Sequence, residues 1–150
     1  MLEPGEVAPP FELRNQDGDV VSLADFRGQR VVVYFYPRAG TAGCTREANE
    51  YADRLGEFRD RDVAVVGVSD DDVEDLAAFA ADEDLPFDLL SDPDGEVARA
   101  YDSYGTRSIG DREVTASFRN TYVVDGDGIV EAAYEGVDPV GHVDDVLAGL

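Results

Sequence analysis

The sequence predicts an α/β fold, in which a central mixed β-sheet is covered by helices on both faces. Three observations lead to this prediction. Two uninterrupted runs of β-forming residues, 31–36 and 63–68, have the composition of strands that are buried on both faces. Each run is followed by a segment in which apolar residues recur at helical spacing. Near both ends of the chain, turn residues separate short apolar stretches as they do in β-hairpins.

The expected elements alternate between strands and helices after an N-terminal pair of strands. In chain order they are strands at 11–13, 20–23 and 31–36, a helix from about 41–44 to about 60, a strand at 63–68, a helix at about 71–83, a short strand at 89–90, a short helix at about 94–102, strands at 118–125 and 129–134, and a helix at about 139–149.

Turn and apolar residues justify the first half of this order. The sequence Asn15-Gln16-Asp17-Gly18 is a strong hairpin signal between the first two strands. Pro37 ends the first buried strand, and the small residues after it lead into the first long helix. That helix places three apolar residues at helical spacing, namely Tyr51, Leu55 and Phe58.

Similar signals justify the second half. Ser69 and Asp70 are placed to cap the next helix, which has Val73, Leu76, Phe79 and Ala80 on one face. Residues 103–116 are polar, and we expect them to be irregular. The turn Gly126-Asp127-Gly128 joins two antiparallel strands. The last helix is amphipathic and turns Val143, Val146 and Leu147 inward.

Length and composition indicate one domain, residues 1–150, with one hydrophobic core. The chain has 150 residues, of which 43% are hydrophobic. No apolar run approaches the roughly 18–20 residues that a membrane span needs. The first ten residues contain neither a basic segment nor an apolar one of the kind found in secretory signals. We therefore expect a soluble, cytoplasmic protein.

The formal net charge of −22 excludes some partners and suggests an environment. A surface this acidic repels nucleic acid and anionic membranes. All twelve basic residues are arginines, and aspartates outnumber glutamates by 22 to 12. Because repulsion between like charges is screened within about 3 Å at 1 M salt, the composition predicts a halophilic protein adapted to a cytoplasm with molar salt.

The chain has one cysteine, Cys44, and one histidine, His142. A single cysteine excludes an intramolecular disulfide and a cysteine-based zinc cluster, and leaves a buried inert thiol, a reactive thiol or an intermolecular link. Cys44 lies between a predicted buried strand and a predicted helix, where ligands bind in open α/β sheets. The first turn of a helix offers unpaired N–H groups and the positive end of the dipole, and both favour a thiolate.

The segment around Cys44 resembles the active-site motif of peroxiredoxins, Pro-x-x-x-Thr-x-x-Cys, at Pro37, Thr41 and Cys44. The chain looks most like the bacterioferritin-comigratory-protein, or peroxiredoxin Q, branch, and the similarity covers nearly its whole length. The matching stretches are Tyr34-Phe35-Tyr36-Pro37, Gly43-Cys44-Thr45, Val66-Gly67-Val68-Ser69, Leu85-Pro86-Phe87, Leu89-Leu90-Ser91-Asp92-Pro93 and Gly141-His142. This resemblance implies a thioredoxin-like fold and the thiol-dependent reduction of hydrogen peroxide and organic hydroperoxides, with a role in antioxidant defence and redox homeostasis.

The resemblance also implies a role for each motif residue. Cys44 would be the peroxidatic thiolate, which attacks the distal peroxide oxygen and becomes a sulfenic acid. Thr41 would hydrogen-bond the peroxide, and Pro37 would shield the thiolate from water. Arg119 matches the second-site arginine of the family and would stabilise the thiolate and the charge that develops in the transition state.

Two further residues support this site, and simpler readings remain for three. The backbone N–H groups of Gly43 and Cys44 would add donors, and Glu47 would orient Arg119. Glu47 is alternatively a first-turn acid favoured by the helix dipole. Thr41 is alternatively an N-cap hydroxyl. Without the resemblance, Arg119 would be assigned to a surface ion pair.

Two positions depart from the family pattern. Ala42 replaces the proline that commonly precedes Gly-Cys, and Asn49 stands where many members of the branch carry a resolving cysteine. The resemblance then implies regeneration by an external reductant, either a low-molecular-weight thiol or a thioredoxin-like or glutaredoxin-like protein. The chain is expected to be a monomer or a weak homodimer, with a Cys44–Cys44 link between subunits as the other way to resolve the sulfenic acid. Over-oxidation of Cys44 to sulfinic acid is an expected liability.

Other functions remain as alternatives. A thioredoxin-fold peroxide sensor or holdase without significant turnover would also use Cys44, and a cysteine hydrolase would pair Cys44 with His142. We expect no metal site, since the acidic groups Asp70-Asp71-Asp72 and Asp125-Gly126-Asp127 do not continue into a calcium loop and are best explained as solvated turns. No glycine-rich phosphate loop is present, so no cofactor is implied.

Overall fold

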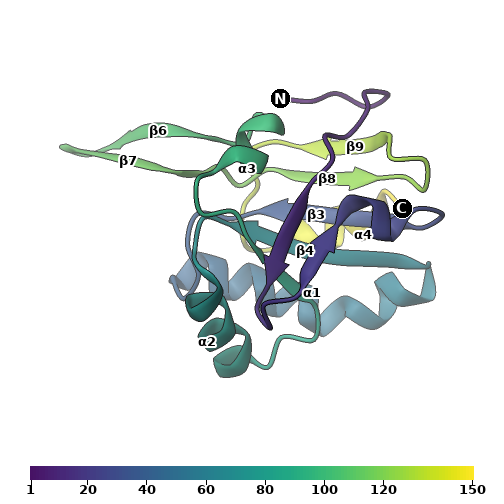
Figure 1. Cartoon of the computed structure of the whole chain (residues 1–150), viewed down its shortest axis with the longest axis horizontal. Coiled ribbons are helices and arrows are strands. Elements are labelled where there is room, and N and C mark those ends of the chain that lie inside the picture. Colours follow the sequence, from purple (N-terminus) through teal and green to yellow (C-terminus); the bar gives the residue numbers. More distant parts are fainter.

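A seven-stranded sheet runs through the middle of the molecule (Figure 1) in the order β2-β1-β5-β4-β3-β8-β9. This computed structural model describes the backbone of residues 1–150 and every side chain except that of Ile109. The strands are β1 (Glu12–Asn15), β2 (Val20–Ser22), β3 (Arg30–Phe35), β4 (Val63–Ser69), β5 (Asp88–Ser91), β8 (Thr121–Val124) and β9 (Val130–Tyr134). The β3–β4 and β4–β5 pairs are parallel and the other four pairs are antiparallel. The prediction of a mixed sheet with an N-terminal hairpin is confirmed.

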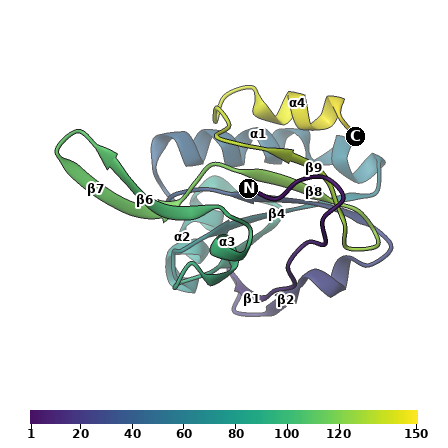
Figure 2. The ribbon, with the colours of Figure 1, turned by 90° about the horizontal axis from the view of Figure 1, so that it is seen from above.

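Helices lie on both faces of this sheet, as predicted. They are α1 (Ala42–Asp60), α2 (Val73–Glu83), α3 (Glu96–Ala100) and α4 (His142–Ala148), with a 3-10 turn, η1, at Leu23–Phe26. Figure 2 shows α1 and α4 side by side over one face. The buried side chains of α2 belong to the same core as those of α1 and α4, whereas α3 and the N-terminal segment pack on the opposite face. No helix among the described residues is both long and apolar enough to cross a membrane.

Strand β3 lies between these two cores, which explains why its sequence has no polar alternation. Val32 and Tyr34 belong to the core beneath α1, while Val31, Val33 and Phe35 belong to the core on the other face. All five side chains are at most 1% exposed. Because successive side chains of a strand point to opposite faces, a central strand must be apolar on both.

The expectation that residues 103–116 are irregular is wrong. They contribute to an antiparallel hairpin of β6 (Tyr104–Ile109) and β7 (Arg112–Ser117), which projects from the body of the molecule (Figures 1 and 2). Most side chains of β7 are exposed, so the apolar alternation that identifies a half-buried strand is weak here. The turn of this hairpin contains Gly110, which adopts a positive φ of 62°.

The cap of α2 and the start of β8 also differ from expectation. The helix is capped by Asp72, whose carboxylate accepts a hydrogen bond from the Asp75 N–H at 3.0 Å, and not by Ser69 or Asp70. The strand expected from residue 118 begins at Thr121, because the preceding residues cross from the hairpin back to the sheet. Helices α3 and α4 are shorter at both ends than the sequence indicated.

A close aromatic contact on the sheet depends on a glycine. Tyr34 and Gly67 are partners in the β3–β4 register, and the Tyr34 ring lies over the Gly67 backbone. A Cβ atom at residue 67 would lie 2.8 Å from Tyr34 Cζ. The same ring stacks on Tyr51 of α1 with centroids 4.5 Å apart, so this contact joins the sheet to the helix that carries Cys44.

We predict that Gly67→Ala lowers the free energy of unfolding by about 1–3 kcal/mol, because the added methyl overpacks the Tyr34–Tyr51 stack. Urea unfolding of the two proteins measures the difference. The control is Gly56→Ala on the exposed side of α1, where a Cβ meets nothing within 4 Å. Helix propensity alone should make that variant more stable by about 0.5–1 kcal/mol. If the two variants had the same free energy of unfolding, the proposed contact between residue 67 and the Tyr34 ring would be contradicted.

Candidate active site

Cys44 lies in the first turn of α1, just beyond the carboxyl end of β3. Thr41 is the N-cap residue of this helix, so Cys44 is the third helical residue. Its side chain is only 1% exposed. The thiol therefore lies where the helix dipole and the unpaired N–H groups of the first turn act most strongly on a negative charge.

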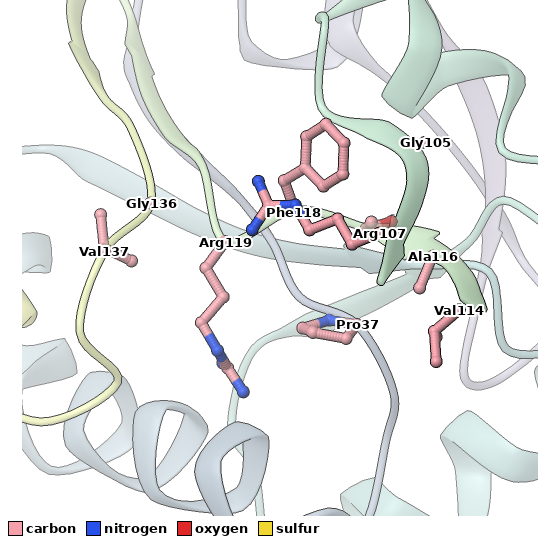
Figure 3. A pocket seen from close by; sticks show the side chains of 10 residues that line it. Pro37, Gly105, Arg107, Val114, Ala116, Phe118, Arg119, Gly136 and Val137 are labelled. Atoms are coloured by element: carbon pink, nitrogen blue, oxygen red, sulfur yellow. The ribbon is translucent and has the colours of Figure 1, made fainter. Parts of the chain in front are cut away.

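The structure brings Arg119 to Cys44 from 75 residues away in the chain. The guanidinium Nη2 lies 3.3 Å from the sulfur and donates to it. Arg119 belongs to the link between β7 and β8, and its side chain reaches toward α1 (Figure 3). A guanidinium in this position offers a charged hydrogen-bond donor to a buried sulfur.

Backbone hydrogen bonds fix the link that carries Arg119. The Phe118 N–H donates to the Ser103 carbonyl at 2.8 Å, and the Val137 N–H donates to the Arg119 carbonyl at 2.8 Å. The Asn120 side chain donates to Ser103 Oγ at 3.1 Å and accepts from the Gly136 N–H at 3.0 Å. Arg119 is thus held between the hairpin base and the segment after β9.

Glu47 lies one turn after Cys44 on the same side of α1 and pairs with the same guanidinium. Its Oε1 atom is 3.3 Å from Arg119 Nη1, and its side chain is fully buried. Oε2 has no hydrogen-bond partner among the described residues. Burial raises the pKa of Glu47 to about 7, and the nearby Arg119 opposes that rise. The Glu47 carboxylate and the Cys44 sulfur therefore contact the same guanidinium group.

Gly43 leaves the space in which Arg119 approaches the sulfur. A Cβ atom at residue 43 would lie 2.8 Å from Arg119 Nη2, the nitrogen that contacts Cys44. The absence of a side chain at this position is therefore a condition for the contact.

Pro37 and Thr41 belong to the loop between β3 and α1. Pro37 is partly buried and faces Arg119 across a cavity (Figure 3). The Thr41 hydroxyl donates to the Arg38 carbonyl at 2.8 Å and does not cap the helix. Because its proton is used in that bond, the Thr41 oxygen is left as a hydrogen-bond acceptor.

Sequence reasoning missed Asp71, which anchors this loop. The Asp71 carboxylate accepts a hydrogen bond from the Ala39 N–H at 2.7 Å and another from the Ser69 hydroxyl at 2.7 Å. Its side chain is buried, so the interpretation of 70–72 as a solvated turn is wrong for Asp71. The carboxylate provides a hydrogen-bond acceptor for the Ala39 N–H, which would otherwise be unpaired. Buried acidic side chains commonly pair with backbone N–H groups in this way.

Two other residues singled out in the sequence lie elsewhere. Asn49 donates to Glu83 Oε1 at 3.0 Å, so the position of the usual resolving cysteine here ties α1 to α2. His142 begins α4, and its ring packs edge-on against Tyr134 with centroids 5.2 Å apart. Burial lowers the pKa of His142 to about 4. Its environment is that of a neutral core residue.

A cavity of about 240 Å³ adjoins Arg119 and Pro37. Its other walls come from the hairpin and from the segment after β9, and Figure 3 shows the side chains around it. The lining residues are Pro37, Gly105, Arg107, Val114, Ala116, Ser117, Phe118, Arg119, Gly136 and Val137. Sequence reasoning missed the hairpin contributions because it expected no strands in 103–116.

We predict that Gly43→Ala slows the reaction of Cys44 with hydrogen peroxide by about tenfold or more, because the methyl displaces the Arg119 guanidinium from the sulfur. Folding should be retained, since the atom displaced is the far end of a flexible side chain. Stopped-flow oxidation of the reduced protein measures the rate. Gly56→Ala, in the same helix, is the control and should react like the wild type. A Gly43→Ala protein as fast as the control would contradict this role.

We predict that Glu47→Gln becomes more stable relative to the wild type as pH rises. The pKa of Glu47 in the folded protein, about 7, lies above the ordinary value of 4.5. The folded wild type therefore binds an extra proton between these values, and the stability that this proton contributes is lost as pH rises through about 7. Between pH 5 and pH 8 the free energy of unfolding of the variant should rise by about 2 kcal/mol relative to that of the wild type. Urea midpoints at both pH values test this, and a constant difference would contradict it.

Comparison with known proteins shows to which family the chain belongs. The AhpC/TSA family profile matches residues 4–133. A putative peroxiredoxin of Mycobacterium tuberculosis is 48% identical over 142 residues, which cover 95% of this chain and 90% of that protein. Peroxiredoxin Bcp of Escherichia coli is 40% identical over 149 residues, which cover 99% of this chain and 96% of that protein.

The fold agrees with a solved structure of the same kind. A peroxiredoxin Q variant from Xanthomonas campestris superposes with a TM-score of 0.87 at 33% identity, and the match covers 92% of this chain and 88% of that one. The predicted thioredoxin-like fold is thereby confirmed. The matched profile, the identities of 40–48% and the shared fold lead to one conclusion: the chain belongs to the AhpC/TSA family of peroxiredoxins, on the Bcp and peroxiredoxin Q side of that family.

Proposed function

We propose that this chain is a thiol-dependent peroxidase that reduces hydrogen peroxide and organic hydroperoxides through a single peroxidatic cysteine, Cys44. The observation that carries the proposal is the contact of 3.3 Å between Arg119 Nη2 and the Cys44 sulfur at the N-terminus of α1. Family membership supports the same activity. Within the family's chemistry, the chain would serve antioxidant defence and redox homeostasis.

In the oxidative step, the Cys44 thiolate attacks the distal oxygen of the hydroperoxide and the O–O bond breaks. The sulfur becomes a sulfenic acid that keeps the attacked O–H, and the leaving oxygen takes a proton from solvent and departs as water or an alcohol. Arg119 and the N–H groups of the first turn of α1, including that of Gly43, stabilise the charge that grows on that oxygen. The Thr41 oxygen accepts a hydrogen bond from the O–H group of the hydroperoxide. Pro37 limits the access of water to the sulfur, and Glu47 positions Arg119.

Regeneration needs two thiols from outside, because the chain has one cysteine. The first thiol attacks the sulfenic acid and releases water, which leaves a mixed disulfide. The second thiol attacks that disulfide, restores the Cys44 thiolate and leaves as the oxidised reductant. A low-molecular-weight thiol and a thioredoxin-like or glutaredoxin-like protein both supply this chemistry. A sulfenic acid without a resolving cysteine is exposed to further oxidation for longer.

We further propose that residues 1–150 form one domain that acts as a monomer or a weak homodimer in a cytoplasm with high salt. The seven-stranded sheet supports a single domain, because it joins β1 and β2 near the N-terminus with β9 near the C-terminus. The net charge of −22 supports the high-salt setting, because close-packed like charges need screening.

We expect one equivalent of hydrogen peroxide to add one oxygen to the reduced protein, and none to the Cys44→Ser variant. Intact-mass analysis in high salt, with a dimedone trap for sulfenic acid, measures both. Full peroxidase activity in Cys44→Ser would rule out the proposed function. Steady-state peroxide consumption with a panel of thiols separates the enzyme from a peroxide sensor or holdase, which would oxidise once and not turn over.

We also predict that the melting temperature falls when KCl is lowered from about 2 M to about 0.05 M, because screening of the acidic surface weakens as the Debye length grows. Scanning calorimetry across the series measures the shift. A melting temperature that stays constant would contradict the proposed salt adaptation, and it would leave the chemistry of Cys44 unaffected.

A further inference from the structure

The cavity beside Arg119 has an unusual charge for this chain. Acidic residues outnumber basic ones by 34 to 12 in the sequence. The described residues that line the cavity nevertheless include two arginines, Arg107 and Arg119, and no aspartate or glutamate. The potential inside this cavity is therefore more positive than that of the surrounding surface, which attracts anions to it.

Arg107 is held at the cavity by an aromatic ring and not by an acid. Its guanidinium lies 3.9 Å from the centroid of the Phe118 ring, and Figure 3 shows the two side chains together above the cavity. Among the described residues, no ion pair or hydrogen bond engages this guanidinium. Stacking fixes the plane of the group while its N–H donors stay unused, which is the arrangement that binds a carboxylate in a bidentate manner.

The walls between the two arginines are mostly apolar. Pro37, Val137 and the hairpin residues Val114 and Ala116 provide them. A volume of about 240 Å³ accommodates a small organic molecule. The cavity therefore offers a mostly apolar space whose lining includes both Arg119, which contacts the Cys44 sulfur, and Arg107, which has no acidic partner among the described residues.

We propose that this cavity binds organic hydroperoxides that carry a carboxylate, with Arg107 as the ligand of the carboxylate and the apolar walls around the hydrocarbon body. The proposal rests on the peroxidase function proposed above and adds a preference among its substrates. Arg107 determines specificity and takes no part in breaking the O–O bond, which is left to Cys44 and Arg119. Hydrogen peroxide has neither a hydrocarbon group nor a carboxylate, so Arg107 does not contribute to its binding.

The test compares three hydroperoxides in single-turnover oxidation of the reduced protein. They are cumene hydroperoxide with a para-carboxylate, the methyl ester of that compound, and hydrogen peroxide. The variants are Arg107→Leu and Arg112→Leu. Arg112 lies on the same hairpin and is not among the described residues that line the cavity, so both variants change the net charge equally.

We expect Arg107→Leu to lower the second-order rate constant for the carboxylate about tenfold, the size of one charge-assisted hydrogen bond in a partly exposed site. The ester and hydrogen peroxide should react as with the wild type, and Arg112→Leu should change none of the three. An equal loss for all three substrates would overturn the proposal, because Arg107 would then only support the hairpin or Arg119. An unchanged carboxylate rate would overturn it as well.

Two further outcomes separate this inference from the proposed function. If Arg107→Leu slows only the reduction of preformed sulfenic acid by a carboxylate-bearing thiol, the cavity serves the reductant and the hydroperoxide assignment is wrong. If the wild type forms no sulfenic acid with any of the three hydroperoxides, the proposed function fails and this inference fails with it. A wild type that reacts with all three but shows no Arg107-dependent difference between carboxylate and ester overturns the inference alone.

Discussion

The contact between the Arg119 guanidinium and the Cys44 sulfur is the interaction on which the rest of the site depends. A sulfur that is 1% exposed gains little solvation from water, so an anionic form needs fixed partners. The structure supplies Arg119 at 3.3 Å and the N-terminus of α1. Glu47 Oε1 accepts a hydrogen bond from the second terminal nitrogen, Nη1, which limits the orientations that Arg119 can adopt.

Much of the fold serves to hold these groups in place. The buried run of β3 sets the position of the loop, Asp71 anchors that loop through the Ala39 N–H, and the Tyr34–Tyr51 stack fixes α1 against the sheet. Backbone hydrogen bonds donated by the Phe118 and Val137 N–H groups hold the segment between β7 and β8, which carries Arg119. The site therefore requires segments from most of the chain, which is why the isolated motif around Cys44 would be insufficient.

Sequence reasoning identified the elements whose signal is local. The apolar runs of β3 and β4 and the turn at 15–18 have one clear interpretation, and their positions were predicted well. The hairpin β6–β7 was missed because it projects from the body and most of β7 is exposed, so burial imposes little apolar alternation on it. Arg119 was identified through the family resemblance, but other long-range contacts left no local sign: neither the buried role of Asp71 nor the close approach of Arg119 to Gly43 follows from spacing. Arg107 is visible only once the hairpin places it beside Phe118.

The measurement that tests the central claim most directly is the single-turnover rate of Cys44 oxidation by hydrogen peroxide in Arg119→Met, with Arg112→Met as the control for the loss of one positive charge. Methionine keeps much of the side-chain volume and removes the donors. The account predicts a loss of about a hundredfold or more for Arg119→Met and no change for the control. A rate for Arg119→Met within about twofold of the wild type, in a variant that melts normally, would contradict it.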